Sequence, residues 1–282
     1  MSARDPSPRV WPAPAKLNLF LHILGRRGDG YHELQTVFQL LDWGDRIGLE
    51  VAAAGEIQRV EGPEGIDAET DLCVRAAQAL RERHPGTGGV RIHLQKRIPT
   101  GAGLGGGSSD AATVLVVLNR LWETGLAEPE LAELGASLGS DVPVFVRGSS
   151  AWAQGRGERL EPVELPERWF VVVYPGVSVG TAEIFQAPEL TRNSSLITIR
   201  AFFQGGTRND FEPVVYARYP EVAAARQWLE QFAPARLTGS GSCVFAAFAR
   251  PEEAERVAAR VPDVWRSFVA RGVNRSPLHE ML

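Results

Sequence analysis

Apolar positions alternate with mostly polar ones along an early segment of the chain, residues 15–24. This period of two is typical of a strand that buries one face. The apolar face carries Leu17, Leu19, Leu21 and Ile23, and the other face carries Lys16, Asn18, Phe20 and His22. The pattern therefore predicts a strand on which Lys16 and Asn18 lie side by side, two residues apart.

The rest of the first half mixes short strand patterns with longer helical ones. Strands are predicted over residues 37–41, 47–51 and 90–94, and helices over 71–83, 109–122 and 129–138. Pro129 suits the first turn of the third helix, and Gly139 suits its end. Because the strands and helices do not alternate regularly, the pattern predicts an α+β fold rather than a repeated βαβ fold.

A polar segment with two prolines, residues 158–168, separates two parts of the chain. We therefore predict two domains, residues 1–163 and 164–282. In the second part, strands are predicted over residues 169–174, 244–248 and 265–270, and helices over 221–231 and 251–261. These elements predict two helices packed on one small antiparallel sheet.

Composition excludes several classes of protein. The 282 residues carry a formal net charge of −4, so no overall positive field attracts nucleic acid or an anionic membrane. The two cysteines, Cys73 and Cys243, cannot form a disulfide framework and are expected to be buried thiols. No apolar run approaches the ~20 residues that span a bilayer, the N-terminus lacks a signal-peptide pattern, and no metal-ligand spacing is present. We expect a cytoplasmic protein with no nucleic-acid or membrane partner.

The densest motif is a run of five glycines in seven positions, from Gly101 to Gly107. Without side chains, backbone N–H groups can close around a bulky anion. The helix predicted to follow has Ser108, Ser109 and Asp110 as N-cap candidates, and a helix N-terminus attracts negative charge. The run therefore predicts a phosphate cradle, most simply for a nucleotide.

Three glycine-rich patterns compete for this run. A P-loop requires lysine where Gly107 stands. A dinucleotide fingerprint is matched by Gly101, Gly103 and Gly106, but it should directly follow a buried strand, and a polar, Pro-containing segment intervenes. The third pattern, Pro-x3-Gly-Leu-Gly-x-Gly-Ser-Ser, runs without a gap from Pro99 to Ser109 and is favoured. A flexible linker is disfavoured, since a strand and an apolar helix flank the run.

Candidate chemistry lies on both sides of the glycine run. Asp141 follows a glycine stop and precedes an apolar stretch, so it is either a general base or an N-cap of the next element. Lys16 is either a reactive-site cation or an edge-strand lysine. A second glycine cluster, Leu237–Val244, either approaches a ligand or makes a tight connection. Phosphoryl transfer needs a nucleotide cradle, a cation and a carboxylate, and the chain offers a candidate for each.

Six segments taken together resemble the GHMP kinases, the superfamily of galactokinase, homoserine kinase and mevalonate kinase. They are Pro14–Leu21, Arg27–Leu34, Pro99–Ala112, Gly139–Phe145, Leu237–Phe248 and Ser276–Leu278. The segment Arg27–Leu34 resembles the branch that acts on 4-diphosphocytidyl-2-C-methyl-D-erythritol. The resemblance implies a two-domain GHMP kinase fold, with an N-terminal nucleotide-binding α+β domain and a C-terminal ferredoxin-like α+β domain. It also implies ATP-dependent phosphorylation of the 2-hydroxyl of that compound in the non-mevalonate isoprenoid pathway. The alternative is a GHMP kinase for another alcohol, such as homoserine or mevalonate.

The resemblance also implies roles for individual residues. Asp141 would be the catalytic base and Lys16 its partner. The loop that wraps the ATP phosphates would comprise Pro99, Thr100, Gly101, Ala102, Gly103, Leu104, Gly105, Gly106, Gly107, Ser108 and Ser109. Asp71 and Lys96 would lie at the adenine, although the family commonly has asparagine where Asp71 stands. The cytidine-diphosphate-linked substrate would be bound by Asn18, Tyr31, His32, Thr181, Phe185 and Gly239, with Tyr31 and Phe185 stacked on either side of the cytosine. Mg2+ is implied by the ATP chemistry, and the chain would be a monomer or homodimer.

Overall fold

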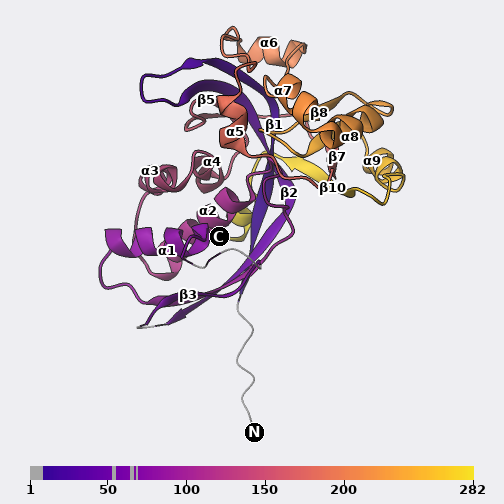
Figure 1. Cartoon of the computed structure of the whole chain (residues 1–282). Coiled ribbons are helices and arrows are strands. Elements are labelled where there is room, and N and C mark those ends of the chain that lie inside the picture. Colours follow the sequence, from indigo (N-terminus) through magenta and orange to yellow (C-terminus); the bar gives the residue numbers. More distant parts are fainter. Residues whose placement is uncertain (1–8, 53–54, 64–66, 68) are drawn as a thin grey trace.

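Two long antiparallel strands run through the whole molecule (Figure 1). The computed structural model describes residues 9–52, 55–63, 67 and 69–282. Within these residues, β1 (Val10–Arg26) pairs with β2 (His32–Ala52), and one end of the pair packs with the N-terminal helices while the other packs with the C-terminal elements. The pair thus connects the two halves. Its register shifts in β1 lie between Pro14 and Lys16, between Asn18 and Leu21, and between Ile23 and Gly25.

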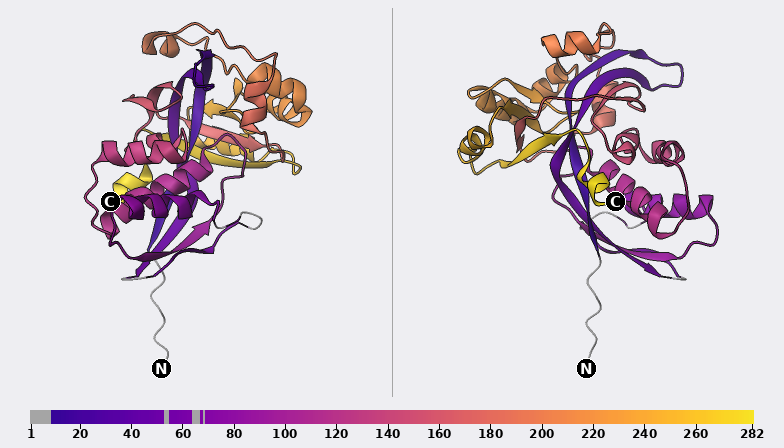
Figure 2. Two further views of the ribbon diagram at one scale, coloured as in Figure 1. Left: turned by 60° about the vertical axis from the view of Figure 1, so that its left-hand side comes forward. Right: turned by 180° about the vertical axis from the view of Figure 1, so that it is seen from behind.

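The first half has one layer of helices on one face of the sheet (Figures 1 and 2). The sheet continues from β2 through β4 (Gly89–Gln95) to β3 (Ile57–Glu61), and on another side through β5 (Ala151–Gly155) to β6 (Arg159–Pro162). The helices are α1 (Leu72–Arg83), α2 (Gly106–Leu121), α3 (Glu128–Leu138) and α4 (Val142–Arg147). Their apolar stripes bury against β2 and β4, and α2 lies at the centre of this core.

The second half extends the same sheet. The strand β10 (Arg266–Val273) pairs with β2 at Gly272 and Val273, and the order continues with β7 (Trp169–Tyr174), β9 (Val244–Phe248) and β8 (Ala235–Leu237), all antiparallel. The helices are α5 (Thr181–Gln186), α6 (Ile199–Gln204), α7 (Glu212–Arg218), α8 (Pro220–Glu230), α9 (Pro251–Ala258) and α10 (Pro277–Met281). The second core includes Leu21 and Ile23 of β1, so the two halves share a strand pair.

The α+β fold predicted from the sequence is confirmed, and two local predictions are wrong. The segments 37–41 and 47–51 belong to one strand, β2. Its polar residues are accommodated because Asp42 accepts a hydrogen bond from the backbone N–H of Arg271, and Asp45 accepts from the backbone N–H groups of Arg97 and Ile98. The helix predicted from residue 109 begins at Gly106, so Ser108, Ser109 and Asp110 lie inside it and Gly105 is its N-cap.

Two further expectations concern domains and membranes. The boundary between residues 163 and 164 stays a prediction; it falls between β6 and β7, but Leu278 of α10 returns to the first core. No helix in the described part of the chain is both long and apolar enough to cross a membrane.

Candidate active site

A cavity of about 1030 Å³ lies between the glycine-rich loop, the β1–β2 pair and α5. Its volume lies at the upper end of the range for small-molecule sites, about 300–1,000 Å³. Every residue assigned to the site from the sequence lines this cavity except Ser109, which is buried in α2 with a hydroxyl that makes no hydrogen bond. Positions far apart in the sequence therefore converge on one space.

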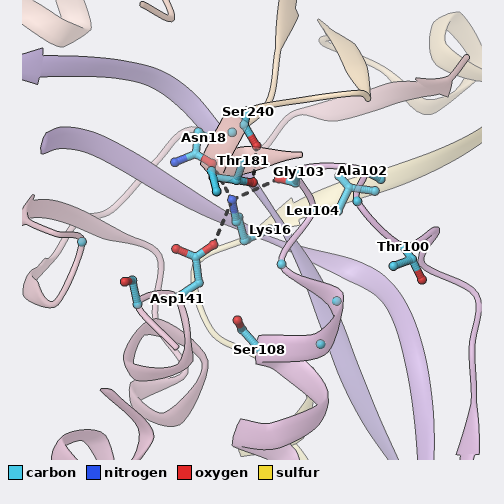
Figure 3. Close-up of a pocket in the computed structure, with 18 of the residues that line it drawn as sticks. Lys16, Asn18, Thr100, Ala102, Gly103, Leu104, Ser108, Asp141, Thr181 and Ser240 are labelled. Atoms are coloured by element: carbon cyan, nitrogen blue, oxygen red, sulfur yellow. Dashed lines mark hydrogen bonds and ion pairs between the residues drawn. The ribbon is translucent and has the colours of Figure 1, made fainter. Parts of the chain in front are cut away.

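Lys16 lies at the centre of the cavity (Figure 3). It is only 3% exposed, and its Nζ donates to Asn18 Oδ1 at 2.5 Å and to the Gly103 carbonyl at 3.0 Å. The same ammonium lies 3.2 Å from Asp141 Oδ2. Three acceptors thus match the three donors of the ammonium, and a buried cation without such partners would be strongly disfavoured.

Asp141 occupies the N-cap position of α4 but does not serve as a side-chain cap. Its carboxylate accepts no capping hydrogen bond from the helix. The side chain, 31% exposed, instead points into the cavity beside Lys16 (Figure 3). Its second oxygen is therefore available to a ligand hydroxyl, and a carboxylate there can accept a proton or a hydrogen bond.

The glycine-rich loop approaches other backbone too closely for side chains. A Cβ at Gly103, where φ is +76°, would lie 2.1 Å from the Thr238 carbonyl oxygen. A Cβ at Gly105, where φ is +72°, would lie 2.9 Å from Phe145 Cζ and 3.1 Å from Lys16 Cε. The loop leads directly into α2, a helix of 16 residues whose first three residues line the cavity, and the first N–H groups of a helix have no acceptor within it. Together these features favour binding of a polyphosphate.

The second glycine cluster, Leu237–Val244, forms hydrogen bonds with the glycine-rich loop. Cys243 N donates to the Ala102 carbonyl at 3.1 Å, and Thr238 Oγ1 donates to the Gly103 carbonyl at 3.1 Å. Gly239 lines the cavity next to Gly103, and the hydroxyls of Thr181 and Ser240 are 2.6 Å apart at its edge (Figure 3). The C-terminal half therefore fixes the phosphate loop and contributes polar groups to the same space.

Beyond the loop, two clusters of charge border the other end of the cavity. Lys96 donates to Asp45 and to Asp110, the latter at 2.8 Å. Burial opposes the charge of Lys96, but the Asp110 and Asp45 carboxylates beside it raise its pKa. Asp71 lines the cavity, where its Oδ1 accepts from Cys73 N at 2.7 Å and its Oδ2 from Arg59 at 2.6 Å. Both oxygens of Asp71 therefore already accept a hydrogen bond.

Aromatic and cationic side chains line the opposite end. His32 is stacked on Phe185, with ring centroids 4.7 Å apart and an interplanar angle of 17°. A base can stack on that face of Phe185 only after His32 moves, and the sandwich of a cytosine between Tyr31 and Phe185 stays a prediction. Tyr31 is 54% exposed, and the guanidinium carbon of Arg156 lies 4.8 Å from its ring centroid.

Arg192 holds His32 and α5 in place at this end of the cavity, and no sequence motif indicated that it belongs to the site. Its guanidinium donates to the carbonyls of Phe185 at 2.9 Å and Ala187 at 2.7 Å, and its Nε donates to His32 Nε2 at 3.3 Å. Burial, Arg192 and Arg26 all lower the pKa of His32. An imidazole that accepts at Nε2 is neutral and carries its proton on Nδ1, which is then a donor for a ligand.

Comparisons with known proteins agree on one family. Residues 71–149 match the family described as GHMP kinases N terminal domain, and residues 188–267 match GHMP kinases C terminal. A protein of Halorhodospira halophila, named 4-diphosphocytidyl-2-C-methyl-D-erythritol kinase, is 57% identical over 273 residues, covering 96% of this chain and 95% of its own. A protein of the same name from Alkalilimnicola ehrlichii is 56% identical over 270 residues, covering 96% of this chain and 93% of its own.

Solved structures give the same result. A crystal structure of 4-(cytidine 5'-diphospho)-2C-methyl-D-erythritol kinase superposes with a TM-score of 0.83 at 36% identity, covering 94% of this chain and all of that one. The Methanococcus jannaschii mevalonate kinase superposes with a TM-score of 0.69 at 17% identity, covering 96% of this chain and all of that one. At that identity the second likeness concerns the fold alone.

Proposed function

The chain belongs to the 4-diphosphocytidyl-2-C-methyl-D-erythritol kinase family of the GHMP kinases, and on that premise we propose that it is an ATP-dependent small-molecule kinase. It transfers the γ-phosphate of ATP to the 2-hydroxyl of 4-diphosphocytidyl-2-C-methyl-D-erythritol, giving the 2-phosphate and ADP in the non-mevalonate isoprenoid pathway. The observation that carries the proposal is the ion pair between buried Lys16 and partly exposed Asp141, which lies in one cavity with the glycine-rich loop.

The phosphates of ATP bind at the glycine-rich loop in this proposal. Close contacts of Gly103 with backbone and of Gly105 with side chains leave room for no further side chain at either position, and the N-terminus of α2 directs free N–H donors and a partial positive charge toward the anion. The Gly103 carbonyl accepts a hydrogen bond from Lys16, so the loop and the reacting side chains are held at a fixed separation. The γ-phosphate is thereby directed toward Lys16 and Asp141.

Asp141 orients and deprotonates the acceptor hydroxyl. As the oxygen–phosphorus bond to the acceptor forms and the bond from phosphorus to the β–γ bridging oxygen breaks, the hydroxyl proton passes to the carboxylate and ADP leaves. Lys16, 3.2 Å from the carboxylate, orients Asp141 and offsets negative charge on the transferring group. Asn18 holds Lys16 from the side and donates through its amide nitrogen to Thr36 Oγ1 at 2.9 Å.

The aromatic end binds the cytosine. Tyr31 provides an exposed ring for stacking, and neutral His32 provides a donor for the acceptor atoms of the base edge. When His32 moves away from Phe185, the face of the Phe185 ring that His32 covers becomes available to the cytosine. Thr181 and Gly239 border the path from this end to Asp141.

The adenine lies at the opposite end, near Asp71 and Lys96. Mg2+ remains a prediction from the chemistry of ATP: the described residues contain no group of three or more His, Cys, Asp or Glu side chains that could hold a metal ion. We assign the transfer chemistry to the side chains and backbone above and assign no residue to the metal.

A coupled assay of ADP release tests the proposal. The purified chain is supplied with ATP, Mg2+ and one of three acceptors: the cytidyl methylerythritol compound, mevalonate or homoserine. We expect kcat/KM for the first to exceed the others by roughly 10³-fold or more, because a site built for a polar base leaves buried groups unpaired when the base is missing. Equal turnover of mevalonate or homoserine would contradict the proposed acceptor, and Lys16→Met serves as the inactive control.

A further inference from the structure

The Lys and Arg side chains that line the cavity differ in whether their charge is already paired. They are Lys16, Arg26, Lys96, Arg156 and Arg192. Lys16 faces Asp141, Lys96 faces two carboxylates, and Arg192 is held by backbone carbonyls. Among the residues that the structure describes, neither Arg26 nor Arg156 forms an ion pair with a carboxylate. Because arginine stays protonated, both present a positive charge that a ligand can use.

Arg156 spans the distance between the two ends of the acceptor half of the cavity. It lies in the turn between β5 and β6, and its neighbour Gly157 lies beside the Asp141 segment, where a Cβ on Gly157 would be in ordinary van der Waals contact, 3.8 Å, with the Ser140 carbonyl oxygen. Its guanidinium carbon, in contrast, lies over the Tyr31 ring. The backbone of Arg156 is thus at the reacting end, and its charged group is at the aromatic end.

The proposed acceptor needs a cation in that position. Its base and its erythritol are joined by a diphosphate, so two negative charges lie between the aromatic end and Asp141, itself a negative group. A guanidinium matches phosphate oxygens with parallel donors and is less costly to desolvate than an ammonium. Arg26 is paired across the β1–β2 ladder with His32, so its backbone lies at the aromatic end, whereas the backbone of Arg156 lies near the Asp141 segment.

We propose that Arg156 binds the diphosphate of the acceptor substrate, a role that rests on the proposed function above. The guanidinium leaves the face of the Tyr31 ring and donates two hydrogen bonds to the phosphate oxygens. The competing interpretation is that Arg156 only holds Tyr31 in place through the cation–π contact. The two interpretations differ in whether the loss of Arg156 affects a ligand that has the base but no phosphate.

Calorimetry with cytidine and CDP, in the presence of a saturating non-hydrolysable ATP analogue that blocks the nucleotide end, separates these interpretations. We expect Arg156→Gln to weaken CDP binding by about 10- to 100-fold, the value of one lost charge-assisted contact, and to leave cytidine affinity within about twofold. Arg156→Lys should recover part of the loss. The matched control is Arg159→Gln, which removes the same charge three residues later, from a side chain paired with Glu33 outside the cavity.

Other results would overturn the inference. Unchanged CDP affinity in Arg156→Gln, or an equal loss for cytidine and CDP, would assign Arg156 to Tyr31 or to no ligand. If the unaltered chain binds the ATP analogue but neither cytidine nor CDP, the proposed acceptor itself is wrong and the role of Arg156 is refuted with it. Thermal unfolding of each variant identifies a loss of folding, and Arg156→Lys carries the comparison where the Gln variant is unstable.

Discussion

Replacing Asp141 with asparagine removes the proposed base and preserves almost all of its shape. At 3.2 Å the attraction between its carboxylate and Lys16 is about 5 kcal/mol at an effective dielectric constant of ~20. Because the Asp141 side chain is 31% exposed, solvent reduces the net contribution to folding to about 1 kcal/mol. Lys16 also keeps Asn18 and Gly103 as acceptors, and the asparagine oxygen can replace the lost one. The variant should therefore fold.

The effect on turnover should be much larger than the effect on folding. A positioned base is worth roughly 10²–10⁴-fold in rate, or about 3–5 kcal/mol, so we expect kcat of Asp141→Asn to fall by that factor. The assay is steady-state ADP release at saturating ATP and acceptor, with urea unfolding measured in parallel.

The control is Asp42→Asn, which makes the same change in a carboxylate that is 34% exposed and 3.6 Å from Arg271, away from the cavity. Asp42→Asn should retain normal kcat with a similarly small loss of stability. A fall of less than tenfold in kcat for folded Asp141→Asn would refute the role of Asp141 as base.

Three further results are expected. Gly105→Val should weaken ATP binding in calorimetry by about 10- to 100-fold or more, because its Cβ meets Phe145 and Lys16. Gly28→Val is the control and should bind ATP normally, because the space around Gly28 is open. Equal ATP affinities of the two variants would contradict the phosphate cradle. Burial, Arg192 and Arg26 lower the pKa of His32 below its ordinary 6.5. KM for the acceptor should therefore be constant from pH 7 to 8 and should rise at lower pH, as acid protonates the imidazole. If KM of His32→Gln rises in the same way at low pH, His32 is not the cause. Burial raises the pKa of the Cys73 and Cys243 thiols, so a thiol reagent should label them only after denaturation, and rapid native labelling would show that one is accessible.

The parts of the site that lie within continuous sequence motifs could be predicted. Alternation along β1 places Lys16 and Asn18 together, and the glycine run predicts a loop that closes on an anion. The predicted start of α2 was wrong because Gly105, with φ of +72°, ends the loop as an N-cap that forms no side-chain hydrogen bond. The side-chain preferences of N-cap residues therefore placed the start of this helix three residues too late in the sequence.

The contacts that depend on distant segments could not be predicted. Arg192 reaches His32 across 160 positions, and Arg156 meets Tyr31 only because β5 pairs with β2. Arginine is common on protein surfaces, so neither residue had a local signal. The stacking of His32 on Phe185 likewise depends on how α5 packs against the end of β1 and β2.

A crystal structure of the ternary complex with a non-hydrolysable ATP analogue and the cytidyl acceptor tests the central claim most directly. The account predicts the γ-phosphorus between the glycine-rich loop and the Lys16–Asp141 pair, with the acceptor 2-hydroxyl about 2.6–3.2 Å from an Asp141 oxygen. A closed complex that holds the γ-phosphate or the 2-hydroxyl far from both side chains would contradict it.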